Sequence, residues 1–294
     1  MKEFKNKVAV ITGAASGIGL GIARRAAKEG MKLVVADIEK DALIKTEEEL
    51  KSSGVDVISV LTDVSKSEAI EKLAQKTIDT FGEVHLLCNN AGVAAPGLLW
   101  ECTLDDWSWV LGVNLWGVIH GVRTFVPIMI QQENECHIVN TSSMAGLMPG
   151  SGGNGIYSVT KQGVVALSES LRDAFMQGGA KIGVSVLCPG IVNTKITDSE
   201  RNRPAEFCGP DYEPCFDRII KNHPDVEELV RGAPKLWEMG TSPDQSGDVV
   251  FEAIKNKIFY IYTEIGLVWK RAMKNRFNEI LEDYQKTKAI LKDL

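Results

Sequence analysis

The chain has 294 residues, 44% of them hydrophobic, and a formal net charge of −6. A chain of this size and composition can bury one large core, so we expect residues 1–294 to form a single domain. The negative charge, without a basic stripe interleaved with aromatic residues, argues against nucleic-acid binding. The charged start runs straight into an apolar segment. We see no signal peptide and no apolar stretch long enough to span a bilayer, and expect a cytoplasmic protein without a membrane partner.

Short apolar, β-branched runs alternate with helical patterns along the chain. Strands are predicted at residues 7–11, 32–36, 55–60, 84–88, 136–140, 181–187 and 258–262. Helices are predicted at residues 20–29, 41–52, 66–81, 103–131, 156–177 and 244–256. This alternation predicts an α/β, doubly wound fold with a seven-stranded parallel sheet flanked by helices on both faces. Ligands bind such sheets beyond the carboxyl ends of the strands.

A glycine-rich loop joins the first predicted strand to the first predicted helix. Gly13, Gly17 and Gly19 follow the spacing G-x-x-x-G-x-G. Such glycines permit a tight turn and close approach to a pyrophosphate, and the helix N-terminus offers amide donors to the phosphates. The alternative is a glycine-rich turn between core elements. The order of strand, loop and helix favours a dinucleotide site.

The second predicted strand ends at Asp37, about twenty residues beyond the glycine loop, where a dinucleotide fold places its ribose-binding acid. Its carboxylate can accept hydrogen bonds from both ribose hydroxyls and would repel a 2′-phosphate. Neither Ala15 nor Ile38 supplies a compensating cation, although Lys40 could swing toward a phosphate. The sequence therefore favours NAD(H) over NADP(H) as cofactor. The alternative makes Asp37 a solvated residue after a strand.

Tyr157 and Lys161 lie one turn apart on a predicted helix, so their side chains share a face. A free phenol has a pKa of about 10, and a nearby cation lowers it by stabilising the phenolate. We expect Lys161 and a cationic cofactor together to make Tyr157 a general acid/base. The alternative is a Tyr/Lys pair on a solvated helix face.

Taken in order, these and further motifs resemble the short-chain dehydrogenase/reductase family over roughly the first two hundred residues. The matching positions are Thr12 to Gly19, Asp37, Asp63 and Val64, Asn89 to Gly92, Asn114, Ser142 and Ser143, Tyr157 to Lys161, Pro189, Gly190 and Thr194. The resemblance implies a cofactor site formed by Gly13, Ser16, Gly17, Ile18, Gly19, Asp37, Asp63, Val64, Asn90, Ala91, Gly92, Tyr157, Lys161, Pro189, Gly190, Val192 and Thr194. Within this set it implies that Asp63 binds the adenine amino group and Thr194 the nicotinamide carboxamide.

The resemblance also implies a catalytic set of Asn114, Ser143, Tyr157 and Lys161. Tyr157 exchanges a proton with the substrate oxygen, and Lys161 lowers its pKa and bonds the nicotinamide ribose. Ser143 donates a hydrogen bond to the same oxygen. Asn114 interrupts helical hydrogen bonding and holds a water for proton relay. An insertion at residues 149–153 departs from the family pattern and leaves Ser142 as the alternative serine.

Residues 195–246 are rich in proline, glycine and aromatic residues and are predicted to form a substrate lid. With Leu98, Trp100 and Leu147 they suggest an apolar pocket for a bulky secondary alcohol or ketone resembling a steroid, terpenoid or aryl ketone. The alternative is that these aromatic residues only pack the lid onto the body. Two alternative functions remain. A 3-oxoacyl-thioester reductase is disfavoured by Asp37 and the acidic charge, and a non-catalytic NAD-sensing protein by the intact catalytic set.

The six cysteines are scattered and include no C-x-x-C pair. Cys208, Cys215 and His223 match no common zinc spacing, so no metal is predicted. The predicted helices around residues 107–130 and 156–176 are apolar over more than one stripe, which indicates subunit contact or deep burial. The resemblance implies a homodimer or homotetramer.

Residues 264–294 form an amphipathic C-terminal extension that begins basic and ends mixed in charge. We expect it to dock on the body or on a neighbouring subunit rather than on a membrane.

Overall fold

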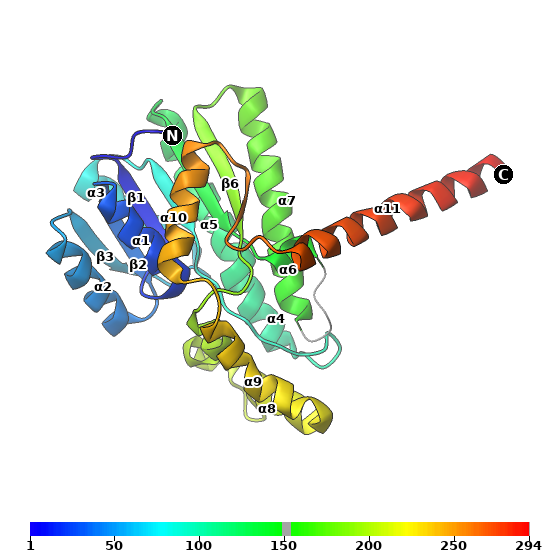
Figure 1. The fold of residues 1–294 in the computed structure, drawn as a ribbon. Coiled ribbons are helices and arrows are strands. Elements are labelled where there is room, and N and C mark those ends of the chain that lie inside the picture. The colour runs from blue at the N-terminus through cyan, green and yellow to red at the C-terminus, as the bar shows by residue number, and fades with distance from the viewer. Residues whose placement is uncertain (149–153, 294) are drawn as a thin grey trace.

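The computed structural model describes residues 1–148 and 154–293. Seven strands form one parallel sheet in the order β3-β2-β1-β4-β5-β6-β7 (Figure 1). The strands are β1 (Val8–Thr12), β2 (Lys32–Asp37), β3 (Val57–Leu61), β4 (Leu86–Asn89), β5 (Cys136–Thr141), β6 (Ile182–Cys188) and β7 (Tyr260–Tyr262). The predicted doubly wound sheet is confirmed, and each strand lies within two residues of its predicted position. The expected insertion at residues 149–153 lies outside the described residues.

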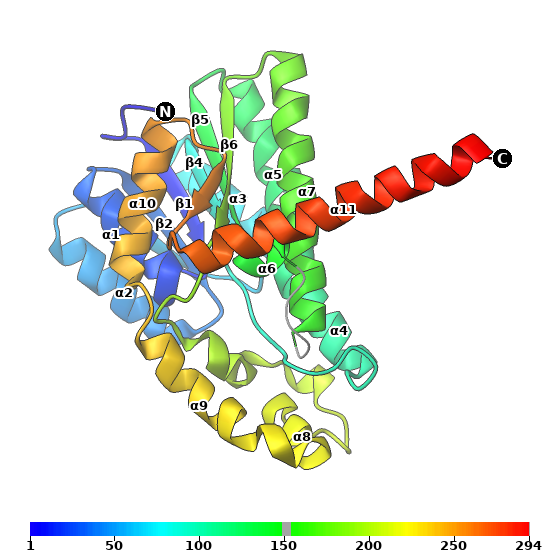
Figure 2. The ribbon, with the colours of Figure 1, turned by 45° about the vertical axis from the view of Figure 1, so that its right-hand side comes forward.

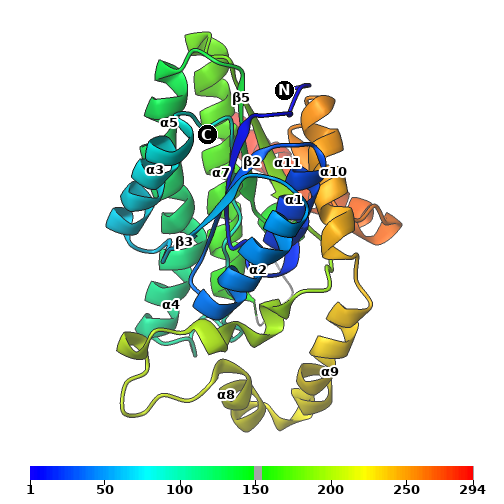
Figure 3. The same ribbon diagram turned by 90° about the vertical axis from the view of Figure 1, so that its left-hand side faces the viewer.

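Helices cover both faces of the sheet, as Figure 3 shows edge-on. One layer contains α1 (Gly17–Lys28), α2 (Lys40–Ser52) and α10 (Pro243–Lys255), and the other contains α3 (Ser67–Phe81), α5 (Gly117–Gln131) and α7 (Gly155–Gly178). Successive strand residues point to opposite faces. Accordingly Val35 packs in the cluster that contains Phe251 of α10, and Val34 packs in the cluster that contains Phe125 of α5. Each fully buried phenylalanine contributes about 2 kcal/mol of transfer free energy.

The predicted helix at residues 103–131 is a continuous helical run with an interruption. It comprises α4 (Leu104–Leu111), a π-helical turn (Gly112–Trp116) and α5. The turn contains Asn114, which confirms that this residue lies where regular helical bonding is broken.

The run Leu104–Gln131 is also long and apolar enough to cross a membrane, by length and composition only. The expectation that no stretch is long enough was therefore wrong. The run packs one side on the sheet and leaves apolar residues such as Trp116 exposed on the other, and apolar residues on both sides raise its hydropathy.

The predicted lid is largely helical and lies beyond the carboxyl ends of the strands, below α4 in Figure 1. After β6 the chain forms 3-10 turns at Lys195–Asn202 and Ala205–Phe207, then α8 (Cys215–Asn222), another 3-10 turn (Pro224–Val226) and α9 (Glu227–Glu238). The lid therefore stands at the edge of the sheet where ligands bind.

The C-terminal extension is a single long helix, α11 (Leu267–Asp293). Trp269 and Met273 pack against a cluster formed largely by α6 (Met144–Leu147), α7 and β6, and Arg276 donates to the Leu147 carbonyl and to Gln162. Beyond this point the helix projects away from the body (Figures 1 and 2). Within the described residues, the expected docking on the body involves only the first part of the extension.

Candidate active site

The glycine loop adopts a backbone that side chains would obstruct. Gly13 and Gly17 have positive φ angles of 65° and 54°. A Cβ on Gly19 would lie 2.0 Å from the Gly13 carbonyl oxygen. Ser16 is the N-cap residue of α1 and Ile18 lies in its first turn. The chain thus meets the two needs of a pyrophosphate site, close backbone approach and free amides at a helix N-terminus.

Asp37 is buried at the end of β2 with both carboxylate oxygens oriented. One oxygen accepts a hydrogen bond from the Ala15 amide at 2.9 Å and the other from the Glu39 amide at 3.0 Å. Burial raises the pKa of Asp37, and the two amide bonds oppose that rise by stabilising the carboxylate. The bond to Ala15 links the acid directly to the glycine loop.

Asp63 lies just beyond β3, where its carboxylate accepts from the Ser65 amide at 3.0 Å and from the Ser65 hydroxyl at 2.7 Å. Val64 beside it is buried. Asp63 also lines a cavity of about 140 Å³ near the ends of β2 and β3. The other lining residues are Ile38, Ser65, Lys66, Ser108, Trp109, Gly112, Val113, Asn202, Pro204 and Phe207.

The segment after β4 holds the glycine loop in place. The Asn90 and Ala91 amides donate to the Thr12 hydroxyl at 3.0 and 3.2 Å, and the Asn90 side chain donates to the Gly13 carbonyl at 3.3 Å. Asn89, one residue earlier, bonds to Asn140 of β5 at 2.9 Å. The predicted cofactor residues after β1 and β4 are therefore brought together.

The segment after β6 reaches the same loop from the other side. The buried Pro189 accepts from the Met144 amide at 2.9 Å, and Gly190 follows it. Val192 is buried and pairs with Thr241. A Cβ on Gly17 would lie 3.0 Å from the Thr194 methyl group, so Thr194 lies against the glycine loop.

The structure distinguishes the two candidate serines. A side-chain hydrogen bond joins Ser143 to Tyr157. Ser143 is also the N-cap residue of α6, where its hydroxyl accepts from the Ala145 amide at 3.1 Å. Ser142 is 1% exposed and donates to the Lys161 carbonyl at 2.7 Å. The serine that contacts the tyrosine is therefore Ser143, and Ser142 braces α7.

Lys161 is 2% exposed, and its ammonium donates to the Thr141 carbonyl at 3.0 Å. Asn114 is fully buried and accepts from the Val93 amide at 2.8 Å. A Cβ on Gly92 would lie 3.3 Å from the Lys161 ammonium and 3.4 Å from the Asn114 amide oxygen. Glycine at position 92 thus leaves room beside both polar groups.

Burial shifts the pKa values of the central pair in opposite directions. It raises the pKa of Tyr157 to about 12, although the hydrogen bond from Ser143 partly opposes this, and it lowers the pKa of Lys161 to about 8. Among the protein's own groups, burial outweighs the hydrogen bond from Ser143, and the joint lowering of the Tyr157 pKa by Lys161 and a cationic cofactor stays a prediction. The ammonium lies 5.4 Å from the centre of the tyrosine ring and bonds to Thr141, while burial disfavours the phenolate.

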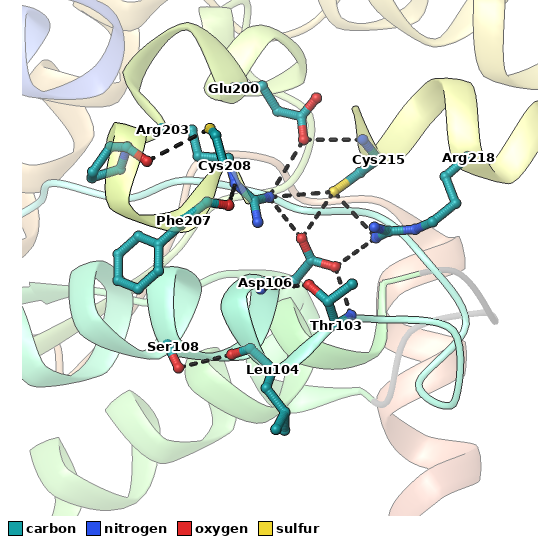
Figure 4. Close-up of polar contacts among 11 residues, drawn as sticks. Thr103, Leu104, Asp106, Ser108, Glu200, Arg203, Phe207, Cys208, Cys215 and Arg218 are labelled. Carbon is teal, nitrogen blue, oxygen red and sulfur yellow. Dashed lines mark hydrogen bonds and ion pairs between the residues drawn. The ribbon is translucent and has the colours of Figure 1, made fainter. Parts of the chain in front are cut away.

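Sequence reasoning missed a buried ion cluster beneath the lid (Figure 4). Asp106 is fully buried and bonds to Arg203 and to Arg218, each at 2.6 Å. A sequence feature that could have pointed to Asp106 is its spacing from Thr103, because the two residues form a capping box at the start of α4.

The three residues weighed as metal ligands have separate contacts. Cys215 lies beside the Asp106 cluster, His223 pairs with Glu101 at 2.9 Å, and the Cys208 thiol lies 3.6 Å from the Pro204 carbonyl. Across residues 1–148 and 154–293, no group of three or more His, Cys, Asp or Glu side chains could hold a metal ion.

Comparison with known proteins agrees with this arrangement. Residues 7–205 match the family model described as short chain dehydrogenase. A CLA biosynthesis dehydrogenase/reductase from Lactiplantibacillus plantarum is 33% identical over 100% of this chain and 96% of its own. A 1-deoxy-11-beta-hydroxypentalenate dehydrogenase from Streptomyces avermitilis is 32% identical over 95% of this chain and 91% of its own. The crystal structure of a short chain dehydrogenase/reductase from Burkholderia phymatum in complex with NAD matches with a TM-score of 0.88 and 40% identity, over 96% of this chain and 97% of that one.

The chain belongs to the short-chain dehydrogenase/reductase family. It is an oxidoreductase that uses a nicotinamide cofactor and acts on a small-molecule substrate. The resemblance drawn from the sequence is confirmed.

Proposed function

We propose that the protein interconverts a bulky, apolar secondary alcohol and its ketone with NAD(H), using Tyr157 as the general acid/base. The observation that carries the proposal is the contact between the Tyr157 and Ser143 side chains next to the buried Lys161. The contact supports the proposal because a proton donor and a second hydrogen-bond donor that lie together could both meet one substrate oxygen. The 1-deoxy-11-beta-hydroxypentalenate dehydrogenase supports the reaction class because its name specifies a hydroxyl-bearing compound.

The bound nicotinamide supplies or accepts the hydride. The protein's part is proton transfer and orientation. A pKa of about 12 keeps the Tyr157 phenol protonated at neutral pH, as the reduction of a ketone requires. The Ser143 hydroxyl donates to the oxygen as negative charge develops. Glycine at position 92 keeps a side chain from crowding the Lys161 ammonium and Asn114, and a water held between these two groups would replace the proton that Tyr157 gives up.

NAD(H) rather than NADP(H) is proposed because Asp37 is a buried carboxylate held by two backbone amides. A 2′-phosphate there would meet negative charge that cannot turn away. The NAD-bound Burkholderia phymatum structure supports this choice. The cofactor would be held by the seventeen predicted residues, with the pyrophosphate at the N-terminus of α1 and the adenosine ribose at Asp37.

The bulky, apolar substrate is proposed from the lid and from apolar side chains in the segments that follow β4 and β5. Of these, Leu147 is buried at 7% exposure, whereas Trp100 is 80% exposed and available to a substrate. Phe216 and Trp237 of the lid are partly buried. A helical lid carrying aromatic residues can order over a large apolar molecule and exclude water from the reacting oxygen.

We further propose a cytoplasmic homodimer or homotetramer that uses the outer faces of α5 and α7. Trp116, Val159 and Met176 lie on these helices or at the turn before α5, and they are 52%, 45% and 76% exposed. Large exposed apolar side chains on neighbouring helices are typical of subunit contacts. Light scattering after size-exclusion chromatography at micromolar concentration should give two or four chain masses, and a monomer would contradict the assembly.

The test of the reaction is a panel of ketones and secondary alcohols assayed with NADH/NAD and NADPH/NADP in parallel. We expect turnover of ring-containing ketones, with kcat/KM at least about tenfold higher for NADH. Turnover confined to 3-oxoacyl thioesters would favour a thioester reductase. Cofactor binding with no turnover across the panel would favour an NAD-sensing protein. Preference for small charged hydroxy acids would contradict the substrate class.

A further inference from the structure

The cavity near the ends of β2 and β3 has two walls from different parts of the chain. Ile38, Asp63 and Trp109 belong to the body, whereas Pro204 and Phe207 belong to the lid. Ile38 directly follows Asp37, the residue at the ribose position of a dinucleotide fold. The cavity therefore lies at the adenosine end of the proposed cofactor site, away from Tyr157. The lid thus reaches the adenosine end of that site.

The buried ion cluster fixes this part of the lid. Arg203 lies between two cavity-lining residues; its side chain is 2% exposed and bonds to Asp106 at 2.6 Å. Its guanidinium also donates to the Phe207 carbonyl at 3.0 Å, which sets the position of the Phe207 backbone. Arg218 of α8 holds the other oxygen of Asp106 at 2.6 Å (Figure 4). Removing one partner from a buried pair leaves an uncompensated charge, so this anchor resists opening.

Further polar contacts hold the two margins of the same segment. Arg201 pairs with Glu39 at 2.7 Å, and Asn202 donates to the same carboxylate at 3.0 Å. On the other margin Glu206 pairs with Lys66 at 2.9 Å, with both side chains more than half exposed. The Lys66–Glu206 pair is exposed and contributes little, whereas the Arg201 and Glu39 side chains are only 25% and 26% exposed. The segment therefore has one buried anchor, a partly buried margin at Glu39 and a weak margin at Lys66.

We propose that the lid forms the roof of the adenosine site. In this proposal Asn202, Pro204 and Phe207 are cofactor-binding residues, and Arg203, held by Asp106, positions them. The inference rests on the proposed dinucleotide site and adds a roof to the residues assigned to it from the sequence. Phe207 and Val113 each pack against the cluster that contains Trp109, and all three line the cavity, so an adenine ring there would have apolar neighbours from both walls. Release of the cofactor then requires the margins at Glu39 and Lys66 to open.

The test compares the binding of NADH, ADP-ribose and reduced nicotinamide mononucleotide to the full-length protein and its variants. Phe207→Ala should weaken NADH and ADP-ribose by the same factor, about tenfold, as expected when an aromatic neighbour of a base is removed. Reduced nicotinamide mononucleotide, which lacks the adenosine, should bind as before. Phe216→Ala is the matched control, because Phe216 lies on the same lid but does not line the cavity, and it should change NADH and ADP-ribose binding by less than twofold.

Stopped-flow release of NADH tests the anchor and the margins. Arg218→Met should speed release at least about fivefold, and Glu206→Gln, at an exposed margin, should speed it about twofold without lowering the melting temperature. An ADP-ribose affinity within twofold of wild type for Phe207→Ala would overturn the roof. So would equal losses for all three ligands, since they would indicate general disruption.

The two proposals can fail separately. If the wild type binds NADH and Phe207→Ala shows the predicted split but no ketone is turned over, the roof holds and the reaction is refuted. If ketones are reduced while Phe207→Ala binds ADP-ribose normally, the roof is refuted and the reaction stands.

Discussion

Lys161→Met should stabilise the protein at neutral pH while removing its activity. The folded structure lowers the pKa of Lys161 to about 8 from an ordinary value of 10.5, chiefly through burial. Below pH 8 the lysine is charged in both folded and unfolded chains, and its burial costs about 3 kcal/mol at pH 7. Methionine has a similar length and no charge to desolvate. The variant lacks the hydrogen bond from Lys161 to the Thr141 carbonyl, which contributes about 1 kcal/mol to stability. The variant should therefore be about 2 kcal/mol more stable at pH 7.

The advantage should disappear as the pH rises. Between about pH 8 and 10.5 the unfolded chain binds more protons at Lys161 than the folded chain does, so the free energy of unfolding of the wild type rises with pH in this window. By pH 10 the burial penalty falls to about 1 kcal/mol, and the two proteins should be equally stable.

Urea unfolding at pH 7, 9 and 10, with unchanged m values, measures the difference. Lys72→Met at an exposed site on α3 controls for the effect of pH on the rest of the protein. A less stable Lys161→Met variant at pH 7, or a difference independent of pH, would refute the reasoning.

Three further predictions concern the proposed reaction. Ser143→Ala should lower kcat by about 10²–10³ and Ser142→Ala by much less, since only Ser143 contacts Tyr157; the reverse order would reassign the serine. Tyr157→Phe should lower kcat at least about 10²-fold with NADH affinity within twofold of wild type, and full turnover would exclude Tyr157 as the proton donor. Asp37→Ala should reduce the preference for NADH over NADPH by about tenfold or more, and an unchanged ratio of kcat/KM values would mean that another residue sets it.

Local pattern along the chain was enough to predict the strands, the glycine loop and the pair of Tyr157 and Lys161. Short apolar runs that alternate with helical patterns along the chain predicted every strand of the sheet. They are continuous because a strand of a parallel sheet is buried on both faces. The glycine loop, Asp37 and the pair of Tyr157 and Lys161 were visible because their spacing along the chain is itself the signal. The break at Asn114 followed from the family resemblance, and the structure shows it as a π-helical turn.

Features that depend on burial and on partners distant in sequence became visible only in the folded chain. Ser142 and Ser143 are adjacent in sequence, and only the packing of α6 against α7 shows which one contacts Tyr157. The direction of the Tyr157 pKa depends on burial, whereas the helical spacing showed only that a cation was near. Arg203 bonds to Asp106 across 97 positions of the chain. No local pattern records such a contact, because it forms only when the lid folds back over the start of α4.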